Sequence, residues 1–472
     1  MIRVFAVLTL GAALLGAAPA AAAEPRYERT ACAGDFGANA GRVECGILTV
    51  DETRGAATGR RVAMPVAVVK ASAPRSGLPP VIYLHGGPGG GTVQGLPGLL
   101  RSPLAREMIA VDQDWVFFDQ RGGELSSPAL DCGEVALNDA GPLSQGAADA
   151  LVACAARHRA AGVDLSRYNT IEIVRDIQDL RTALGYRQFD LLGVSYGTRV
   201  GLAVMRYAPE GLRAAVLDSV WPPEADWAQD GPKMISNAVG VVVDRCAGDP
   251  ACRAKHPRLA AEVRALAAKF NAGPQTVGGR RYTADDLGAF LMDATYFGAA
   301  SLPRDLASLT AGDMAPLNDH IAERSGYVEA QHLTHLCKEE FPFEDRAAVA
   351  RSAAGDPVAQ LSVASFERYF DVCKAYAVGA PDSREAEPVT SAIPTLMLAA
   401  EIDPGCPPDI ARATARRLSR GQLVIAPNTT HGVSFNSRCA RGLIRSFLAA
   451  PERKVDPTCM AAEHARLTFD LD

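Results

Sequence analysis

The pentapeptide GVSYG at residues 193–197 is the feature that most restricts how this chain can fold. It follows a short apolar run at 190–194 and precedes a longer run with helical spacing at 198–208. Ser195, at its centre, is therefore predicted to lie on a sharp turn from a buried strand into a helix. Hydrolases built on an open α/β sheet place a nucleophilic serine on such a turn, so the segment predicts a fold class and a reactive hydroxyl together.

The segments around this turn alternate between strand and helix patterns. Apolar runs predict buried parallel strands at 80–84, 115–118 and 213–217. The apolar spacing from Ile173 to Leu184 predicts a helix that ends at Gly185, and residues 42–50 and 61–70 predict an antiparallel pair of strands. We therefore expect an α/β-hydrolase fold, in which a mostly parallel sheet carries helices on both faces.

The alternation stops after residue 220. From there to about residue 387 the chain is rich in alanine and mostly helical in pattern, and the α/β alternation returns with a strand at 395–399, a helix at 408–418 and a strand at 422–426. We interpret this as one sheet domain with a late insertion. The predicted divisions are a core at 24–220, a helical cap at 221–390 and a second core part at 391–472.

The first 23 residues have the pattern of an export signal. Arg3 gives a positive start, residues 4–15 are apolar but short for a membrane span, and small residues at 18–23 offer a cleavage site. We predict a signal peptide at 1–23 and an exported protein, periplasmic or extracellular; an uncleaved anchor is the alternative.

Eleven cysteines in an exported chain predict disulfide bonds. The sequence does not fix their connectivity, but spacing favours Cys32 with Cys45, Cys132 with Cys154, Cys246 with Cys252, Cys337 with Cys373, and Cys439 with Cys459. Cys406 is then left over. A metal site made of His332, His335 and Cys337 is the rival interpretation, but it lacks a clear fourth ligand, and we expect no metal or other cofactor.

A serine hydroxyl becomes a good nucleophile only when a base takes its proton and a third group orients that base. In this fold the acid precedes the histidine. His431 alone among the later histidines follows a predicted core strand on a loop, so it is the predicted base. Asp403 and Asp218 compete for the role of acid. We favour Asp403, whose neighbours Pro404 and Gly405 mark a tight turn, and expect Asp218 to hold a loop amide.

A glycine-rich segment, HGGPGGG at 85–91, follows the strand at 80–84. Its backbone can approach a substrate closely, so the amides of Gly87 and Tyr196 are the predicted oxyanion donors. A phosphate-binding loop is disfavoured, because no Lys-Ser or Lys-Thr pair follows. Asp119 and Arg121, after the next strand, are predicted to pair with each other as a brace beside the site.

Together these motifs resemble the exported α/β-hydrolase peptidases of the proline iminopeptidase and tripeptidyl aminopeptidase type. The resemblance depends on six segments in the family's order: HGGPGGG at 85–91, DQRG at 119–122, GVSYG at 193–197, PEGLRAAVLDSV at 209–220, EIDP at 401–404 and NTTHG at 428–432. It implies an aminopeptidase that releases a residue or short peptide from a free N-terminus, with Ser195 as nucleophile, Asp403 as acid and His431 as base. Residues 439–459 look like the C-terminal portion of the tripeptidyl branch. Cys406 beside the acid turn departs from the pattern and raises the question of thiol sensitivity.

The same resemblance implies that carboxylates from the cap recognise the substrate's α-ammonium. Glu339 and Glu340 are the candidates. Because neighbouring residues on a helix point apart, we expect at most one of them to face the site.

Net charge and composition limit the other functions. The formal charge is −6 and the basic residues are scattered, which argues against nucleic acid or an anionic membrane as partner. An esterase or amidase acting on small acyl compounds is the alternative enzyme, since the fold does not set the substrate. A non-catalytic binding protein that keeps the fold is the third hypothesis.

Overall fold

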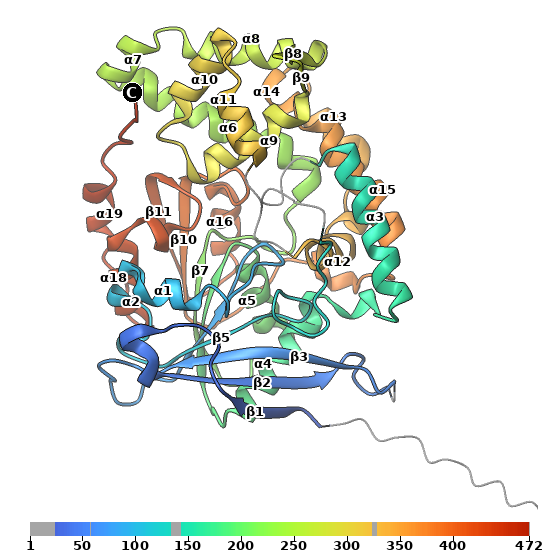
Figure 1. The fold of residues 1–472 in the computed structure, drawn as a ribbon. Helices are drawn as coiled ribbons and strands as arrows, with labels where there is room; N and C mark the ends of the chain where they lie inside the picture. The colour runs from blue at the N-terminus through green and yellow to red at the C-terminus, as the bar shows by residue number, and fades with distance from the viewer. Residues whose placement is uncertain (1–23, 57, 134–142, 323–327, 472) are drawn as a thin grey trace, which may run out of the picture.

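The computed structural model describes residues 24–56, 58–133, 143–322 and 328–471. The signal peptide predicted at 1–23 lies outside these residues. Within them, Figure 1 shows a central sheet flanked by helices, with a group of helices gathered at the top of the view, opposite the first three strands.

The sheet has nine strands in the order β1-β2-β3-β5-β4-β6-β7-β10-β11. Their bounds are β1 Arg26–Thr30, β2 Val43–Asp51, β3 Arg61–Val69, β4 Val81–Leu84, β5 Trp115–Phe118, β6 Phe189–Val194, β7 Leu212–Asp218, β10 Thr395–Ile402 and β11 Gly421–Thr430. Strands β2 and β3 pair antiparallel, as predicted, and β3 joins β5 antiparallel. From β5 to β11 all pairs are parallel, which confirms the predicted mostly parallel sheet. Strand β1, which was not predicted, extends the antiparallel edge.

The central strands are buried on both faces. Every residue of β4, β5 and β6 is buried. Because consecutive strand residues point to opposite faces, Leu191 packs into one hydrophobic cluster and Leu192 into another. The continuous apolar runs that predicted these strands reflect helices on both sides of the sheet.

The helices of the sheet domain are α1 Leu96–Arg101, α2 Pro103–Glu107, α3 Gln145–Ala160, α4 Thr170–Ala183, α5 Tyr196–Tyr207, α16 Pro408–Ala415, α17 Val433–Asn436, α18 Arg438–Ala449 and α19 Thr458–Glu463. Helix α4 confirms the predicted apolar spacing, since Ile173, Ile177 and Leu180 are buried. The Asn169 side chain caps its first turn.

A second group of helices lies between β7 and β10. It comprises α6 Trp227–Gly248, α7 Pro250–Lys255, α8 Leu259–Ala272, α9 Ala284–Phe297, α10 Leu302–Ala311, α11 Ala315–Ala322, α12 Glu329–Glu339, α13 Arg346–Ser352, α14 Pro357–Gln360 and α15 Val363–Tyr376, with the short hairpin β8 Gln275–Val277 and β9 Arg280–Tyr282. The predicted boundaries at 220 and 390 fall in the connections that flank this group. Helix α3, which precedes Ser195 in the sequence, packs against α15 and so lies beside this second group of helices (Figure 1).

Five disulfides have the predicted partners. They join Cys32 to Cys45, Cys132 to Cys154, Cys246 to Cys252, Cys337 to Cys373, and Cys439 to Cys459. Cys406 is free and buried. No helix in the described ranges combines the length and the hydropathy that a bilayer crossing requires.

Candidate active site

Ser195 lies on the turn between β6 and α5, as predicted. Its backbone has φ 57° and ψ −124°, a strained conformation for a residue with a side chain. The Ser195 amide donates a hydrogen bond of 2.9 Å to the carbonyl of Asp218, at the end of neighbouring strand β7. Since β6 lies inside the sheet between β4 and β7, the hydroxyl is placed at the middle of the carboxyl edge.

The glycines on either side of the serine are required by close packing. A Cβ on Gly193 would lie 2.3 Å from the Gly197 carbonyl oxygen, and a Cβ on Gly197 would lie 2.1 Å from the Leu84 carbonyl oxygen. These obstacles are backbone atoms and cannot rotate away. The two glycines of the pentapeptide are therefore required because β6, α5 and β4 pack closely against one another.

Asp403 and His431 follow β10 and β11 and contact each other. The distance from His431 Nδ1 to Asp403 Oδ2 is 2.8 Å. Because the carboxylate accepts, Nδ1 carries the proton, which leaves Nε2 as the basic nitrogen. The amides of Gly405 and Cys406 donate to Asp403 Oδ1 over 3.1 and 2.8 Å. The tight turn that marked Asp403 in the sequence therefore fixes the carboxylate.

Asp218 has the structural role that was predicted for it. Its two carboxylate oxygens accept hydrogen bonds from the amides of Val433 (2.9 Å) and Ser434 (2.8 Å). These amides begin α17, directly after His431, and Ser219 Oγ accepts from the Gly432 amide. Asp218 thus anchors the loop that carries the histidine.

Cys406 lies among Ser195, Asp403 and His431. The Cys406 side chain hydrogen-bonds to Ser195, and burial, with Asp403 adding to it, raises the pKa of the thiol well above its ordinary value. Ligand atoms of Asp403, Cys406 and His431 lie within 4.8 Å of one another, the one such metal-capable group found among the described residues. The imidazole and carboxylate of this group already bond each other.

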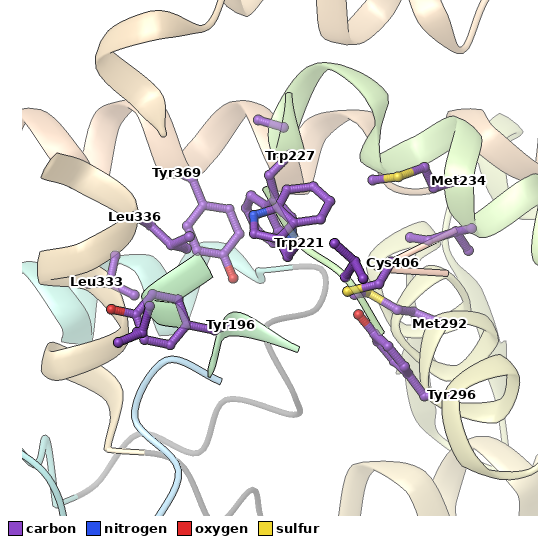
Figure 2. Close-up of a cluster of buried hydrophobic side chains, with 14 of the residues drawn as sticks. Tyr196, Trp221, Trp227, Met234, Met292, Tyr296, Leu333, Leu336, Tyr369 and Cys406 are labelled. Carbon is purple, nitrogen blue, oxygen red and sulfur yellow. The ribbon is translucent and has the colours of Figure 1, made fainter. Parts of the chain in front are cut away.

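A pocket opens over the serine. It is lined by Gly87, Pro88, Ser195, Tyr196, Trp221, Trp227, Tyr296, His332, His335, Leu336, Glu339, Glu340, Gly405 and Cys406. Figure 2 shows Tyr196 and Leu336 on one side of the hydrophobic cluster around it, Cys406 and Tyr296 on the other, and the two tryptophans between them. Both residues predicted as oxyanion donors, Gly87 and Tyr196, thus line the same pocket as Ser195.

Tyr296, from the end of α9, contacts the ring of His431. Its ring meets the imidazole of His431 edge-on at a centroid distance of 4.7 Å. Its hydroxyl lies against Gly405, where a Cβ would come within 1.7 Å of the oxygen. Gly405 therefore leaves room for the tyrosine beside the acid turn.

Glu339 and Glu340 both line the pocket, so the expectation that at most one would face the site was wrong. Helix α12 ends at Glu339, and Glu340 is the residue after its last turn, so the two are not consecutive residues of a regular helix. Both converge on Arg199: its Nε lies 3.2 Å from Glu339 and its Nη1 lies 2.6 Å from Glu340. All three side chains are buried.

The carboxylates are also fixed by other donors. The amide and the hydroxyl of Thr170 each donate a hydrogen bond of 2.5 Å to Glu339. The Thr170 hydroxyl also shares a 2.7 Å hydrogen bond with the Tyr196 hydroxyl. The Trp221 indole donates to Glu340 over 3.1 Å. The end of the pocket is thus one hydrogen-bonded network that reaches the residue next to the nucleophile.

Asp119 and Arg121 do not pair with each other, contrary to the prediction. The fully buried Arg121 donates two hydrogen bonds of 2.7 Å to Asp176 on α4. Asp119 accepts from the amides of Thr92, Val93 and Leu125 at 2.8–3.0 Å. Both still brace loops near the site, but Arg121 and two of the three amides that Asp119 binds have partners far away in the sequence.

The rival metal site does not form. The sulfur of Cys337 is bonded to Cys373 and is not a thiolate ligand. His332 Nδ1 donates to the Pro88 carbonyl (3.1 Å) and His335 Nδ1 to the Gln331 carbonyl (2.7 Å). Both histidines instead form part of the pocket wall.

Sequence reasoning missed the pocket residues Trp221, Tyr296 and His335, and it missed Arg199, which pairs with the two pocket glutamates. One signal was present: Arg199 lies one helical turn after Ser195, within the otherwise apolar run that predicted α5. A cation in such a run requires a buried acidic partner. The other three arrive from segments far along the chain and give no local signal.

Replacing Arg199 by methionine is expected to lower the free energy of unfolding by about 3–5 kcal/mol, because two buried carboxylates would lose their cation. Denaturant unfolding would measure it. As a matched control, Arg175→Met removes an exposed arginine paired with Glu172 and should cost no more than about 1 kcal/mol. Equal stability of the Arg199 variant and the native chain would contradict the pairing.

Comparison with known proteins agrees with this geometry. Residues 79–252 match the family model described as alpha/beta hydrolase fold, and residues 360–459 match the one described as TAP-like protein. The chain is 29% identical over 204 residues to a tripeptidyl aminopeptidase of Streptomyces lividans, covering 40% of this chain and 37% of that protein.

Two further relatives give shorter alignments. The serine protease Hip1 of Mycobacterium tuberculosis is 31% identical over 153 residues, 30% of this chain and 29% of that protein. A proline iminopeptidase of Arabidopsis thaliana is 28% identical over 166 residues, 33% of this chain and 32% of that protein. Each alignment spans well under half of the relative's length. The chain therefore has the α/β-hydrolase fold and carries a TAP-like segment at residues 360–459.

Proposed function

We propose that the protein is a serine exopeptidase that releases an N-terminal residue or short peptide through an acyl-enzyme on Ser195. One observation carries this proposal: the pocket that contains Ser195 also contains two buried carboxylates that share a single arginine. The tripeptidyl aminopeptidase, serine protease and proline iminopeptidase relatives support it.

In the proposed reaction, His431 Nε2 takes the proton of the Ser195 hydroxyl as its oxygen attacks the carbonyl carbon of the scissile peptide bond. Asp403 holds the imidazole oriented and stabilises its cation. The amides of Gly87 and Tyr196 donate to the oxygen that becomes negative. The histidine then gives its proton to the leaving amine, and a water repeats the sequence to free the acyl product. No metal or cofactor is needed for these steps.

The far end of the pocket selects the substrate by charge. Glu339 and Glu340 together with Arg199 carry one excess negative charge when both carboxyls are ionised. A peptide's α-ammonium carries one positive charge, and a buried site compensates it far more strongly than water-exposed charges would. Peptides with a free N-terminus are thus the proposed substrates.

Free and N-acetylated versions of the same peptide arylamide test the proposal. We expect the native protein to lose most of its kcat/KM on the acetylated series, because acetylation removes the cation that the pocket compensates. Free mono-, di- and tripeptide arylamides would also show how many residues leave. Equal rates on free and blocked substrates would instead favour an esterase or amidase of the same fold.

Glu339→Gln and Glu340→Gln are expected to raise KM for free-amine peptides by about tenfold or more while sparing simple esters, since a hydrogen bond or ion pair to a charged group is lost. KM should also depend on pH. Burial raises the pKa of Glu340 to about 7, although Arg199 opposes the rise. Below that pH the Glu340 carboxyl is protonated and the site loses its excess charge.

KM for free-amine substrates should therefore fall as pH rises through about 7, until the substrate's own amine loses its proton near pH 8. In Glu340→Gln this fall should be absent. Steady-state kinetics at several pH values, with an ester as reference, would measure it. Unchanged selectivity in both glutamine variants would remove these residues from the proposed site.

We also propose that the protein works outside the cytoplasm. Five disulfides fit an oxidising compartment, and the predicted signal at 1–23 would direct the chain there. Comparing the mass of the protein recovered from the periplasm or medium with that of the full chain would show whether the segment is removed.

A further inference from the structure

His335 on α12 lines the pocket and has a ring nitrogen that can only accept a hydrogen bond. The side chain is 1% exposed and lines the pocket. Its Nδ1 lies 2.7 Å from the carbonyl of Gln331, and a carbonyl cannot donate, so Nδ1 carries the proton. Burial lowers the pKa of this histidine, which keeps the ring neutral. Nε2 is thus a lone-pair acceptor.

Nε2 of His335 has no hydrogen-bond partner among the residues that the structure describes. Buried polar atoms in folded proteins nearly always have one, because an unpaired acceptor loses its bonds to water without replacement. A pocket wall is a place where a ligand can supply the missing donor. The donor that fits must also tolerate the negative charge of the glutamates nearby.

The neighbouring carboxylates already accept hydrogen bonds from within the protein. Glu339 accepts from Thr170 twice and contacts Arg199, and Glu340 Oε1 accepts from both Arg199 and Trp221. A cation that enters the pocket is therefore attracted by the glutamates, and a neutral acceptor beside them can orient it. His335 Nε2 is such an acceptor on the same wall.

We propose that His335 Nε2 accepts a hydrogen bond from the α-ammonium of the substrate's first residue and so fixes where the N-terminus lies. This inference rests on the proposed exopeptidase function. The His335 ring meets the Tyr196 ring edge-on at 5.1 Å, and Tyr196 follows the nucleophile directly. This ring contact links His335 to the residue beside Ser195, and in the proposal the spacing between Nε2 and Ser195 sets how many residues are released.

His335→Phe tests the proposal, because phenylalanine keeps the ring contact with Tyr196 and removes the acceptor. We expect kcat/KM for a free-amine peptide arylamide to fall by about 10- to 100-fold, mainly through KM, as for a lost hydrogen bond to a charged group. Hydrolysis of a simple aryl ester should keep its rate. His335→Gln, whose amide oxygen can accept, should recover part of the loss.

His158→Phe is the matched control, since His158 is also buried and bonded to a carbonyl but belongs to α3, outside the pocket lining. It should leave the ratio of peptide to ester rates unchanged. An equal loss on peptide and ester in His335→Phe, or no loss on the peptide, would overturn the role of His335. The native protein's ratio on free and acetylated peptides separately decides the exopeptidase proposal.

Discussion

Ser195→Ala is expected to abolish covalent labelling by a fluorophosphonate and to lower kcat by about 10⁶-fold, as when the nucleophile of a serine peptidase is removed. The reagent bonds to an activated serine oxygen, and in the proposed triad His431 and Asp403 activate the oxygen of Ser195. Mass spectrometry of the labelled protein and steady-state rates on a peptide arylamide would measure both effects.

Cys406→Ala is the informative control, because Cys406 hydrogen-bonds to Ser195 and is itself a nucleophile by type. Labelling that persists in this variant assigns the reaction to the serine oxygen. A native protein that stays unlabelled would favour the hypothesis of a binding protein that keeps the fold.

Asp403→Asn is expected to lower kcat by about 10⁴-fold while the protein remains folded. An asparagine amide would donate to His431 Nδ1, which would then have to accept, and the ring proton would move to Nε2. In that tautomer the histidine cannot take the proton of Ser195. Rates on peptide and ester substrates should fall together, since the defect lies in the acid–base pair.

Asp218→Asn tests which of the two candidate carboxylates, Asp403 or Asp218, is the acid that orients His431. Asp218 accepts two backbone amides at the start of α17, so its replacement should mainly lower the free energy of unfolding. Urea unfolding of both variants beside their rates would compare the effects. A large fall in kcat for Asp218→Asn, together with a nearly native kcat for Asp403→Asn, would reverse the assignment.

The features that sequence reasoning predicted correctly have local causes. Ser195 was placed on its turn because Gly193 is required by a backbone contact with Gly197, within the same unit of strand and helix. The parallel strands were visible because burial on both faces makes them continuously apolar. Asp403 was distinguished by the turn whose amides it binds. In each case the deciding contact lies within a few residues or one supersecondary unit.

The features that were missed depend on distant segments. Arg121 was expected to pair with nearby Asp119, but it reaches Asp176, 55 residues away. Glu339 and Glu340 were expected to diverge, yet Arg199, more than a hundred residues earlier, draws them together. A buried charge takes whichever opposite charge the tertiary packing brings near, and sequence spacing does not encode that choice.

The bond between Cys337 and Cys373 fastens α12 to α15. Helix α12 carries Glu339 and His335, which form the pocket wall proposed to bind a peptide's first residue. That wall is therefore held by a disulfide, which forms only under oxidising conditions. A newly made chain, still reduced, would hold Ser195 on its turn by packing alone while that wall was tethered by non-covalent contacts. In the proposed exopeptidase, selectivity for a free N-terminus would therefore depend on oxidation of this cysteine pair.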